Sequence, residues 1–342
     1  MSDIRGTVLY DKALGCLLGG LIGDAMGTPT EGKDPQYIEE HFGWVDDFDG
    51  TGTDDTLMKT FLAQALIETG GNATLDDWAR TWVENWAKVT AAQRTKFFVS
   101  VLHTIEKLRH GQLVPRMVAL GNMPSSSTAM CISPVGIVNA CNPRQAALQA
   151  YGLAALIHVH DVAFCQDGAA AMAAAVAEAF CADSTVESIV AAARGAILPE
   201  SGREMLGRID MILELARHHT DYRAFRAAVY DLGGTFLTPI LCDSRETIPL
   251  TLGLFLLADG DVERSIIYCA NLGRDADTIA SMCGAIAGAY CGAGSIRADW
   301  VVKARGQAAT DQDDLAEQLV EVALSRSREE ERACVRLGLI SG

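Results

Sequence analysis

Two short runs of acidic and hydroxyl side chains stand out in this 342-residue sequence. The first is Thr53-Asp54-Asp55-Thr56, and the second is Asp275-Ala276-Asp277-Thr278. Each run directly precedes an apolar stretch with helical periodicity, so N-capping by Thr and Asp accounts for one or two residues in each. Four aspartates exceed that need, because adjacent carboxylates repel one another unless a cation lies between them.

A set of ligands that contains only carboxylate and hydroxyl oxygens, with no His or Cys, suits Mg²⁺, Mn²⁺ or Ca²⁺ better than zinc or copper. Two aspartates from each run could hold a pair of such ions about 3.5–4 Å apart. A pair of ions can chelate vicinal hydroxyls of a substrate and acidify a water. We therefore expect the two runs to meet in one metal site.

Two glycine stripes flank these acidic runs. Glycine recurs at every fourth position in Gly15, Gly19, Gly23 and Gly27, and again in Gly284, Gly288 and Gly292. Each helical glycine costs about 0.5–1 kcal/mol relative to alanine, so the stripes need a reason. A ridge without side chains lets a second helix backbone approach closely. Tight core packing alone explains the stripes as well as a functional role does.

Helical periodicity runs almost from end to end, and alternation of period two is hard to find. We expect an all-α protein with about a dozen or more helices, in one domain spanning residues 1–342, because no flexible linker divides the chain. Residues 44–52 and 115–134 lack a clean pattern and could carry binding loops. The clearest predicted helices are residues 75–89, 144–157, 169–181, 186–197, 204–218 and 315–336.

The composition excludes some classes of protein. With 28 basic and 44 acidic side chains, the net charge is −16, which argues against binding a nucleic-acid backbone. No apolar run reaches the roughly 18 residues of a membrane span, and the charged start differs from a secretory signal. We expect a soluble cytoplasmic protein whose ten scattered cysteines are mostly reduced core residues.

Three blocks of the sequence resemble the signature blocks of the ADP-ribosylglycohydrolase family. They are residues 19–31, 53–56 and 271–288, in the family's order. That family includes the dinitrogenase-reductase-activating glycohydrolase and the ADP-ribosyl-acceptor hydrolases. The resemblance implies a compact orthogonal multi-helix bundle with two divalent cations, Mg²⁺ or Mn²⁺, in a central cleft. It also implies hydrolysis of an N- or O-glycosidic bond at C1 of a ribose.

The resemblance carries over to individual residues. It places Thr53, Asp54 and Asp55 on one side of the metal site, and Glu31 beside the scissile bond. The opposite side would be formed by Asp275, Asp277 and Thr278. Breaking a ribosyl bond requires a group that takes the proton of the attacking water. Asp54, Asp55 and Glu31 are all candidates; we favour Glu31 for a role away from the metal and retain Asp55 as a second catalytic candidate.

Other residues match the family's substrate-binding segments less closely. The stretch containing Ser126, Ser127 and Thr128 resembles a substrate loop, but it lacks the usual Asn-Gly and the Arg after Met. His158 and His160 replace a Thr-His pair, and each is more commonly a hydrogen-bonded core histidine than a ligand.

A further departure is Arg274, which stands where the family commonly has glycine. It could bind a substrate phosphate or pair with a surface carboxylate. Asp24, within the first glycine stripe, is expected to hydrogen-bond to backbone rather than to bind metal.

These observations favour a hydrolase that removes ADP-ribose from a modified protein or small acceptor. An alternative is hydrolysis of a simpler ribosyl compound such as a nucleoside, since the departures fall where the substrate should be recognised. A second alternative is a non-catalytic, crystallin-like relative. The complete acidic set argues against it, because a protein that kept only the fold could lose these charges without penalty.

Overall fold

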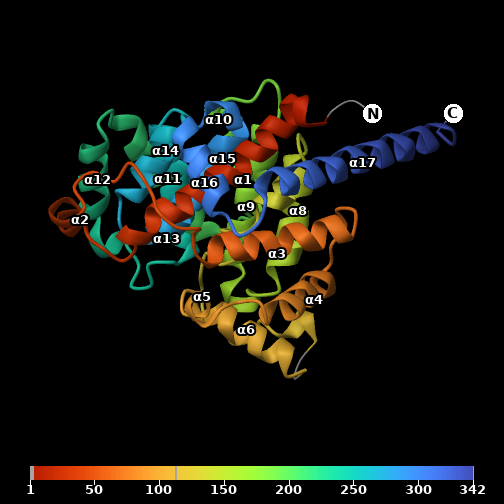
Figure 1. Ribbon diagram of the computed structural model, residues 1–342, viewed down its shortest axis with the longest axis horizontal. Helices are drawn as coiled ribbons and strands as arrows, with labels where there is room; N and C mark the ends of the chain where they lie inside the picture. Colours follow the sequence, from red (N-terminus) through yellow and green to blue (C-terminus); the bar gives the residue numbers. More distant parts are fainter. Residues whose placement is uncertain (1–3, 112–113, 342) are drawn as a thin grey trace.

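The computed structural model describes residues 4–111 and 114–341, which form α-helices and short 3₁₀ turns without any strand. The predicted all-α class is confirmed (Figure 1). The helices are α1 (Val8–Gly27), α2 (Pro35–His41), α3 (Asp54–Glu68), α4 (Leu75–Trp86), α5 (Ala91–Arg94), α6 (Val99–Arg109), α7 (Ser133–Val138), α8 (Pro143–Ala154), α9 (Phe164–Ala179), α10 (Val186–Gly195), α11 (Arg203–His218), α12 (Tyr222–Asp231), α13 (Ser244–Leu257), α14 (Val262–Ala270), α15 (Ala276–Cys291), α16 (Ala298–Gln307) and α17 (Gln312–Gly338).

Local capping explains where several predicted helices begin. A capping box joins Thr74 to Asp77 at the start of α4, and Asn142 caps α8 ahead of Pro143. Helix α9 begins at Phe164, earlier than its alanine-rich part suggested, because the polar segment before Ala169 is also helical. The irregular segment 44–52 is a loop, whereas α7 begins inside the segment 115–134.

The two glycine stripes pack on each other along α1 and α15. Gly15 faces the carbonyl oxygen of Gly288, and Gly19 faces that of Gly284. At the far end, Gly27 faces Ala276. Positions that rise along α1 contact positions that fall along α15, so the two helices are antiparallel. The carboxyl end of α1 therefore lies beside the amino end of α15, which brings the first and third signature blocks together.

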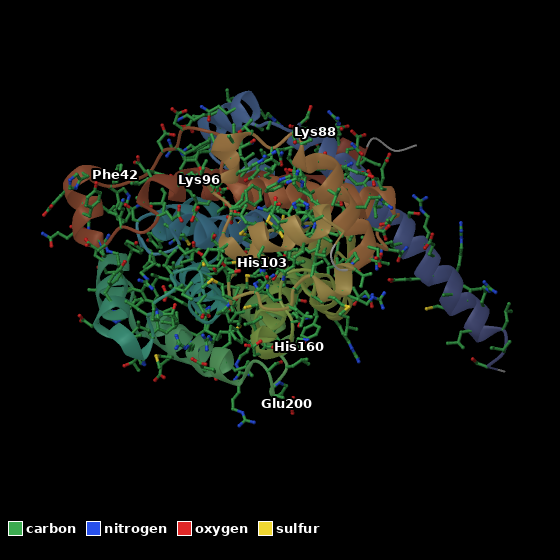
Figure 2. All side chains as sticks on the ribbon, turned by 90° about the horizontal axis from the view of Figure 1, so that it is seen from below. Phe42, Lys88, Lys96, His103, His160 and Glu200 are labelled. Atoms are coloured by element: carbon green, nitrogen blue, oxygen red, sulfur yellow. The ribbon has the colours of Figure 1, made fainter. Side chains whose placement is uncertain are left out.

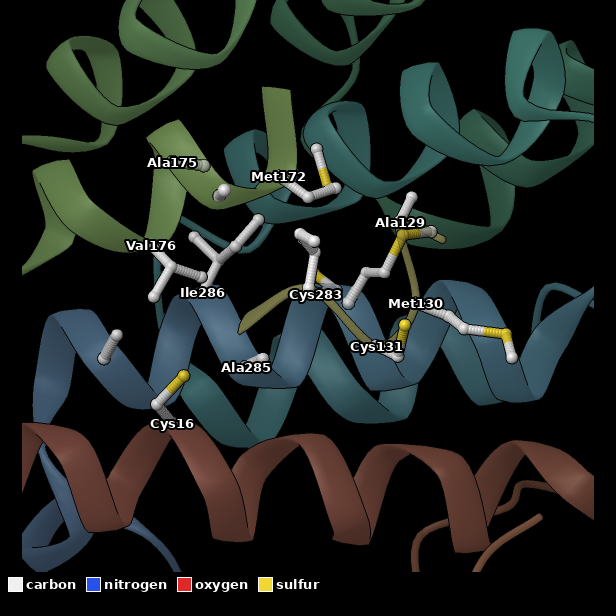
Figure 3. Close-up of a cluster of buried hydrophobic side chains, with 14 of the residues drawn as sticks. Cys16, Ala129, Met130, Cys131, Met172, Ala175, Val176, Cys283, Ala285 and Ile286 are labelled. Carbon is white, nitrogen blue, oxygen red and sulfur yellow. The ribbon is translucent and has the colours of Figure 1, made fainter. Parts of the chain in front are cut away.

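Helix α15 lies between α1 and α9 in the core (Figure 3). Cys283 and Ile286 of α15 lie near Met172 and Val176 of α9, and Cys16 projects from α1. The core is mainly aliphatic, as the composition indicated. Six of the ten cysteines are buried, whereas Cys141 and Cys334 are exposed.

The periphery is less regular than this centre. Helices α3 to α6 form one side of the molecule, and α17 projects from the body (Figure 1). The first half of α17 packs through buried Leu315 and Leu319, whereas Val335 and Leu337 near its end are exposed. No helix within the described part of the chain is long and apolar enough to span a membrane.

Candidate metal centre

The amino end of α3 is capped by a residue from α1. The buried carboxylate of Asp24 accepts hydrogen bonds from the backbone N–H groups of Thr53 (2.9 Å) and Thr56 (3.0 Å). It also accepts from their hydroxyl groups, at 2.9 Å and 2.6 Å. Because Asp24 makes this cap, the carboxylates of Asp54 and Asp55 are not needed for it. They occupy the first turn of α3 and are buried.

The amino end of α15 supplies the opposite group of candidate ligands. Asp275, Asp277 and Thr278 are all buried there. The Thr278 hydroxyl donates a hydrogen bond to Asp55 Oδ2 at 3.3 Å, which directly joins the two acidic runs. The hydroxyl of Ser126 donates to Asp275 Oδ2 at 3.2 Å.

The carboxylates gather into two overlapping groups. Oxygen atoms of Asp24, Asp55 and Asp277 lie within 4.8 Å of one another, as do those of Glu31, Asp275 and Asp277. Asp277 belongs to both groups. Asp55 Oδ1 is buried and has no hydrogen-bond partner among the described residues. A hard divalent cation would satisfy such an oxygen, so these residues fit the metal chemistry that the sequence predicts.

The acidic site raises the pKa values of its own carboxyl groups. Burial, followed by the charge of Asp24, raises the pKa of Asp54 to about 8. Burial, followed by the charge of Glu31, raises the pKa of Asp275 to about 7. Burial and neighbouring carboxylates also hold the pKa values of Asp55 and Asp277 well above the usual range. Without a cation, the protein therefore retains protons at this site near neutral pH.

A cavity of about 580 Å³ opens over these carboxylates, a size typical of small-molecule sites. Its floor is acidic, and Lys96 is the one basic side chain among the described residues that line it. The backbone N–H of Lys96 donates to the carbonyl oxygen of Gln93 at 3.0 Å, whereas its exposed ammonium makes no ion pair or hydrogen bond with the described residues. The lining residues are Glu31, Thr53, Asp54, Asp55, Thr95, Lys96, Phe97, Phe98, Val99, Met123, Ser126, Ser127, Met130, Pro239, Ile240, Leu241, Cys242, Asp275, Asp277 and Thr278.

The predicted substrate residues fall into two sets. Ser126 and Ser127 line the cavity, whereas Thr128 and His158 are buried outside its lining. His158 bonds to Thr128 Oγ1 (3.2 Å) and to Ser125 Oγ (2.9 Å) behind the cavity wall. Burial lowers the pKa of His158 to about 3, so its imidazole is neutral near pH 7. His160 is exposed and lies well apart from Lys96 (Figure 2).

Arg274 also lies outside the cavity lining. Its guanidinium donates to both carboxylate oxygens of Glu246, at 2.7 and 2.9 Å, and to the carbonyl oxygen of Thr238 at 2.6 Å. Glu246 is fully buried, so the partner is a core carboxylate rather than a surface one. Arg274 thus ties the segment before Pro239 to the start of α15.

The backbone of the Arg274 turn positions the Glu31 loop. Gly32 N–H donates to the carbonyl oxygen of Arg274 at 2.7 Å, and Arg274 N–H donates to that of Lys33 at 3.3 Å. These two bonds hold the loop that carries Glu31 against the residue that precedes Asp275.

Parts of the cavity wall lacked any signal in the sequence. The segments 95–99 and 239–242 line the cavity, but neither contains a motif. The irregular segment 115–134, by contrast, does supply Met123, Ser126, Ser127 and Met130. Only the absence of helical periodicity could have pointed to these loops, and it does not say which cavity they face.

Known proteins resemble this chain over most of its length. A model of the ADP-ribosylglycohydrolase family matches residues 5–329. The uncharacterised protein YegU of Escherichia coli (strain K12) is 28% identical over 308 residues, which span 84% of this chain and 89% of that protein. ADP-ribosylhydrolase ARH3 of Xenopus tropicalis is 25% identical over 347 residues, or 89% and 93% of the two chains. The solved structure of an ADP-ribosylglycohydrolase-related protein complex shares the fold, with a TM-score of 0.63 at 21% identity, and covers 92% of this chain and 99% of that chain.

Proposed function

Because the chain belongs to the ADP-ribosylglycohydrolase family, we propose that it hydrolyses the bond between C1 of an ADP-ribosyl group and a protein or small acceptor. The observation that carries the proposal is Asp55 Oδ1, a buried oxygen without a partner in the described chain, on a residue that lines a cavity of about 580 Å³. Divalent cations, Mg²⁺ or Mn²⁺, would be held by Asp54, Asp55, Asp275 and Asp277, with the hydroxyl groups of Thr53 and Thr278. When bound, such ions supply Lewis acidity and a template for the ribose hydroxyls.

Side chains of the protein would transfer the proton, contact the substrate and exclude water. Glu31 lies at the cavity and belongs to one of the carboxylate groups, so it can take a proton from the attacking water. Ser126 holds Asp275 by a hydrogen bond and, with Ser127, presents hydroxyl groups to the cavity. The apolar wall formed by Phe97 and Phe98 keeps water from that side of the reacting bond.

The buried acidic group also argues for a working site rather than a fold kept for packing alone. Several carboxylates of like charge in a buried site destabilise a chain that never binds a cation. A protein without this function would gain stability by replacing Asp55 or Asp277 with a neutral residue. Nucleoside hydrolysis uses the same ribosyl chemistry, and the substrate panel described below distinguishes it from removal of ADP-ribose.

The test compares the wild-type protein with Asp277→Asn, and with the exposed Asp183→Asn as a matched control. We expect Mn²⁺ or Mg²⁺ to raise the melting temperature of the wild type and of the control, but much less that of Asp277→Asn. We expect Asp277→Asn to lose more than about 100-fold in hydrolysis rate while circular dichroism shows unchanged helical content.

Substrate identity is tested with ADP-ribosyl-arginine, ADP-ribosyl-serine and a panel of nucleosides, followed by product analysis. Release of ADP-ribose is the expected result. Turnover of nucleosides alone would contradict removal of ADP-ribose, and a fully active Asp277→Asn protein would contradict the metal assignment. No change in melting temperature at saturating metal would count against a working metal centre.

A further inference from the structure

We propose that Lys59 is a positioning residue that balances part of the negative charge of the acidic site from behind and thereby limits its affinity for divalent cations. This inference rests on the metal centre proposed above. It concerns the side of the site that faces away from the cavity, since Lys59 is not among the lining residues.

The position of Lys59 follows from the helices that carry the acidic site. Lys59 lies one turn beyond Asp55 on α3, and Ser281 lies one turn beyond Asp277 on α15. The ammonium of Lys59 donates a hydrogen bond to Ser281 Oγ at 3.1 Å. The Lys59–Ser281 contact therefore repeats the contact between the two acidic runs, one turn deeper in the core.

The surroundings of Lys59 are unusual for a lysine. Its side chain is only 3% exposed, and the hydroxyl of Ser281 is its one hydrogen-bond partner within residues 4–111 and 114–341. A neutral hydroxyl cannot offset the desolvation of a buried ammonium. Asp24 supplies an opposite charge, since its carboxylate interacts electrostatically with Lys59. Burial raises the pKa of Asp24, and Lys59 is the one cation among the groups that oppose this rise.

A glycine of α1 outside the glycine stripe, Gly20, makes room for this ammonium. A methyl group on Gly20 would collide with Lys59 Nζ. Gly20 thus faces Lys59 of α3 as well as Ser281 and Ala285 of α15, whereas Gly19 and Gly23 face only the backbone of α15. The buried charge explains why residue 20 is a glycine, because the methyl group of an alanine there would displace the ammonium of Lys59.

The expected effect of Lys59 differs between the metal-free and metal-bound states. Without metal, its positive charge offsets repulsion among ionised carboxylates and stabilises the folded chain. With metal, the same charge repels the cations. Removing the charge should therefore weaken the metal-free protein and strengthen metal binding, provided that the carboxylates are ionised.

The experiment measures Mn²⁺ affinity by titration calorimetry, and melting temperature with and without Mn²⁺, at mildly alkaline pH. The variant is Lys59→Met, which keeps the length of the side chain and removes its charge. We expect a lower melting temperature without metal, a larger increase on adding Mn²⁺, and a dissociation constant lower by about tenfold.

Two control variants separate charge from packing. Ser281→Ala removes the hydrogen bond but keeps the ammonium, and should leave the dissociation constant within about twofold of wild type. Lys12→Met removes a partly buried lysine elsewhere in the chain, which donates to Ala179 O at 2.6 Å, and should leave the metal response unchanged. If Lys59→Met does not fold, Lys59→Gln provides the same comparison.

The outcomes separate this inference from the proposed function. If the wild type does not bind Mn²⁺, the metal centre itself is wrong. If the wild type binds Mn²⁺ and the folded Lys59 variants bind it with equal or lower affinity, only the role assigned to Lys59 is overturned.

Discussion

Asp24 and Asp55 are both buried aspartates next to the amino end of α3, yet their partners give them different roles. The carboxylate of Asp24 accepts hydrogen bonds from four groups, the backbone N–H and the hydroxyl of both Thr53 and Thr56. One oxygen of Asp55 has no partner in the described chain. The first residue orients the helix, and the second has an oxygen that is available to the proposed cation. At the scale of single residues, the hydrogen-bond partners therefore decide the role, because residue type and burial are the same.

Lys96 also matters at the residue scale, because it is the one basic residue among the described residues that line the cavity, and its ammonium has no hydrogen bond or ion pair with the described chain. We predict that Lys96→Gln raises the KM for an ADP-ribosyl substrate by about 3–10-fold, since an ammonium can pair with a phosphate. A nucleoside carries no phosphate, so its KM should not change. Steady-state kinetics check this, with Lys88→Gln as the exposed-lysine control. Equal effects on both substrates would contradict a role in phosphate recognition.

At the scale of elements, the pairing of α1 with α15 positions the whole site. The contact depends on backbone approaching backbone, as where Gly19 faces the carbonyl oxygen of Gly284. The same antiparallel pairing brings the Glu31 loop beside Asp275. Asp24 then fixes α3 against α1, so three helices hold the carboxylates together.

We predict that Gly19→Ala destabilises the protein by about 1–3 kcal/mol, because the added methyl group forces α1 and α15 apart. The matched control is Gly152→Ala in α8, where a methyl group would meet no neighbouring atom. That control should be neutral or stabilising by up to about 1 kcal/mol, since alanine favours a helix. Urea unfolding at equal protein concentration measures both. Equal stability changes would mean that the glycine ridge is not a close contact in solution.

At the scale of the whole molecule, the acidity matters through the few carboxylates that are buried together. The net charge of −16 is spread largely over exposed helix faces. The buried set has raised pKa values, including about 8 for Asp54 and about 7 for Asp275. In the unfolded chain these groups titrate near 3.8. Between these values the folded protein binds more protons than the unfolded chain.

We therefore predict that the metal-free protein loses stability as the pH rises from about 4 to about 8, by roughly 2–5 kcal/mol. The sign follows because raised carboxyl pKa values favour folding at low pH, and this contribution disappears as the groups ionise. Saturating Mn²⁺ should remove most of the loss, since it replaces the protons. Thermal unfolding of the EDTA-treated protein across this range measures the effect. A metal-free protein that becomes more stable over the same range would contradict the prediction.

The sequence by itself determined the helices, the glycine stripes and the two acidic runs. Periodicity and capping act over a few residues, so Thr74 and Asn142 mark helix starts without knowledge of the fold. The family blocks then indicated which acidic residues should meet. Thr278 does contact Asp55.

Only the tertiary structure decided which other side chains face the cavity. His158 lies in the core beside Thr128, Arg274 pairs with Glu246, and Lys59 lies behind the carboxylates on Ser281. Each of these contacts joins residues on different segments of the chain. Their distance depends on how the helices pack, and packing depends on shape and volume summed over the whole core, which no local pattern of residues records.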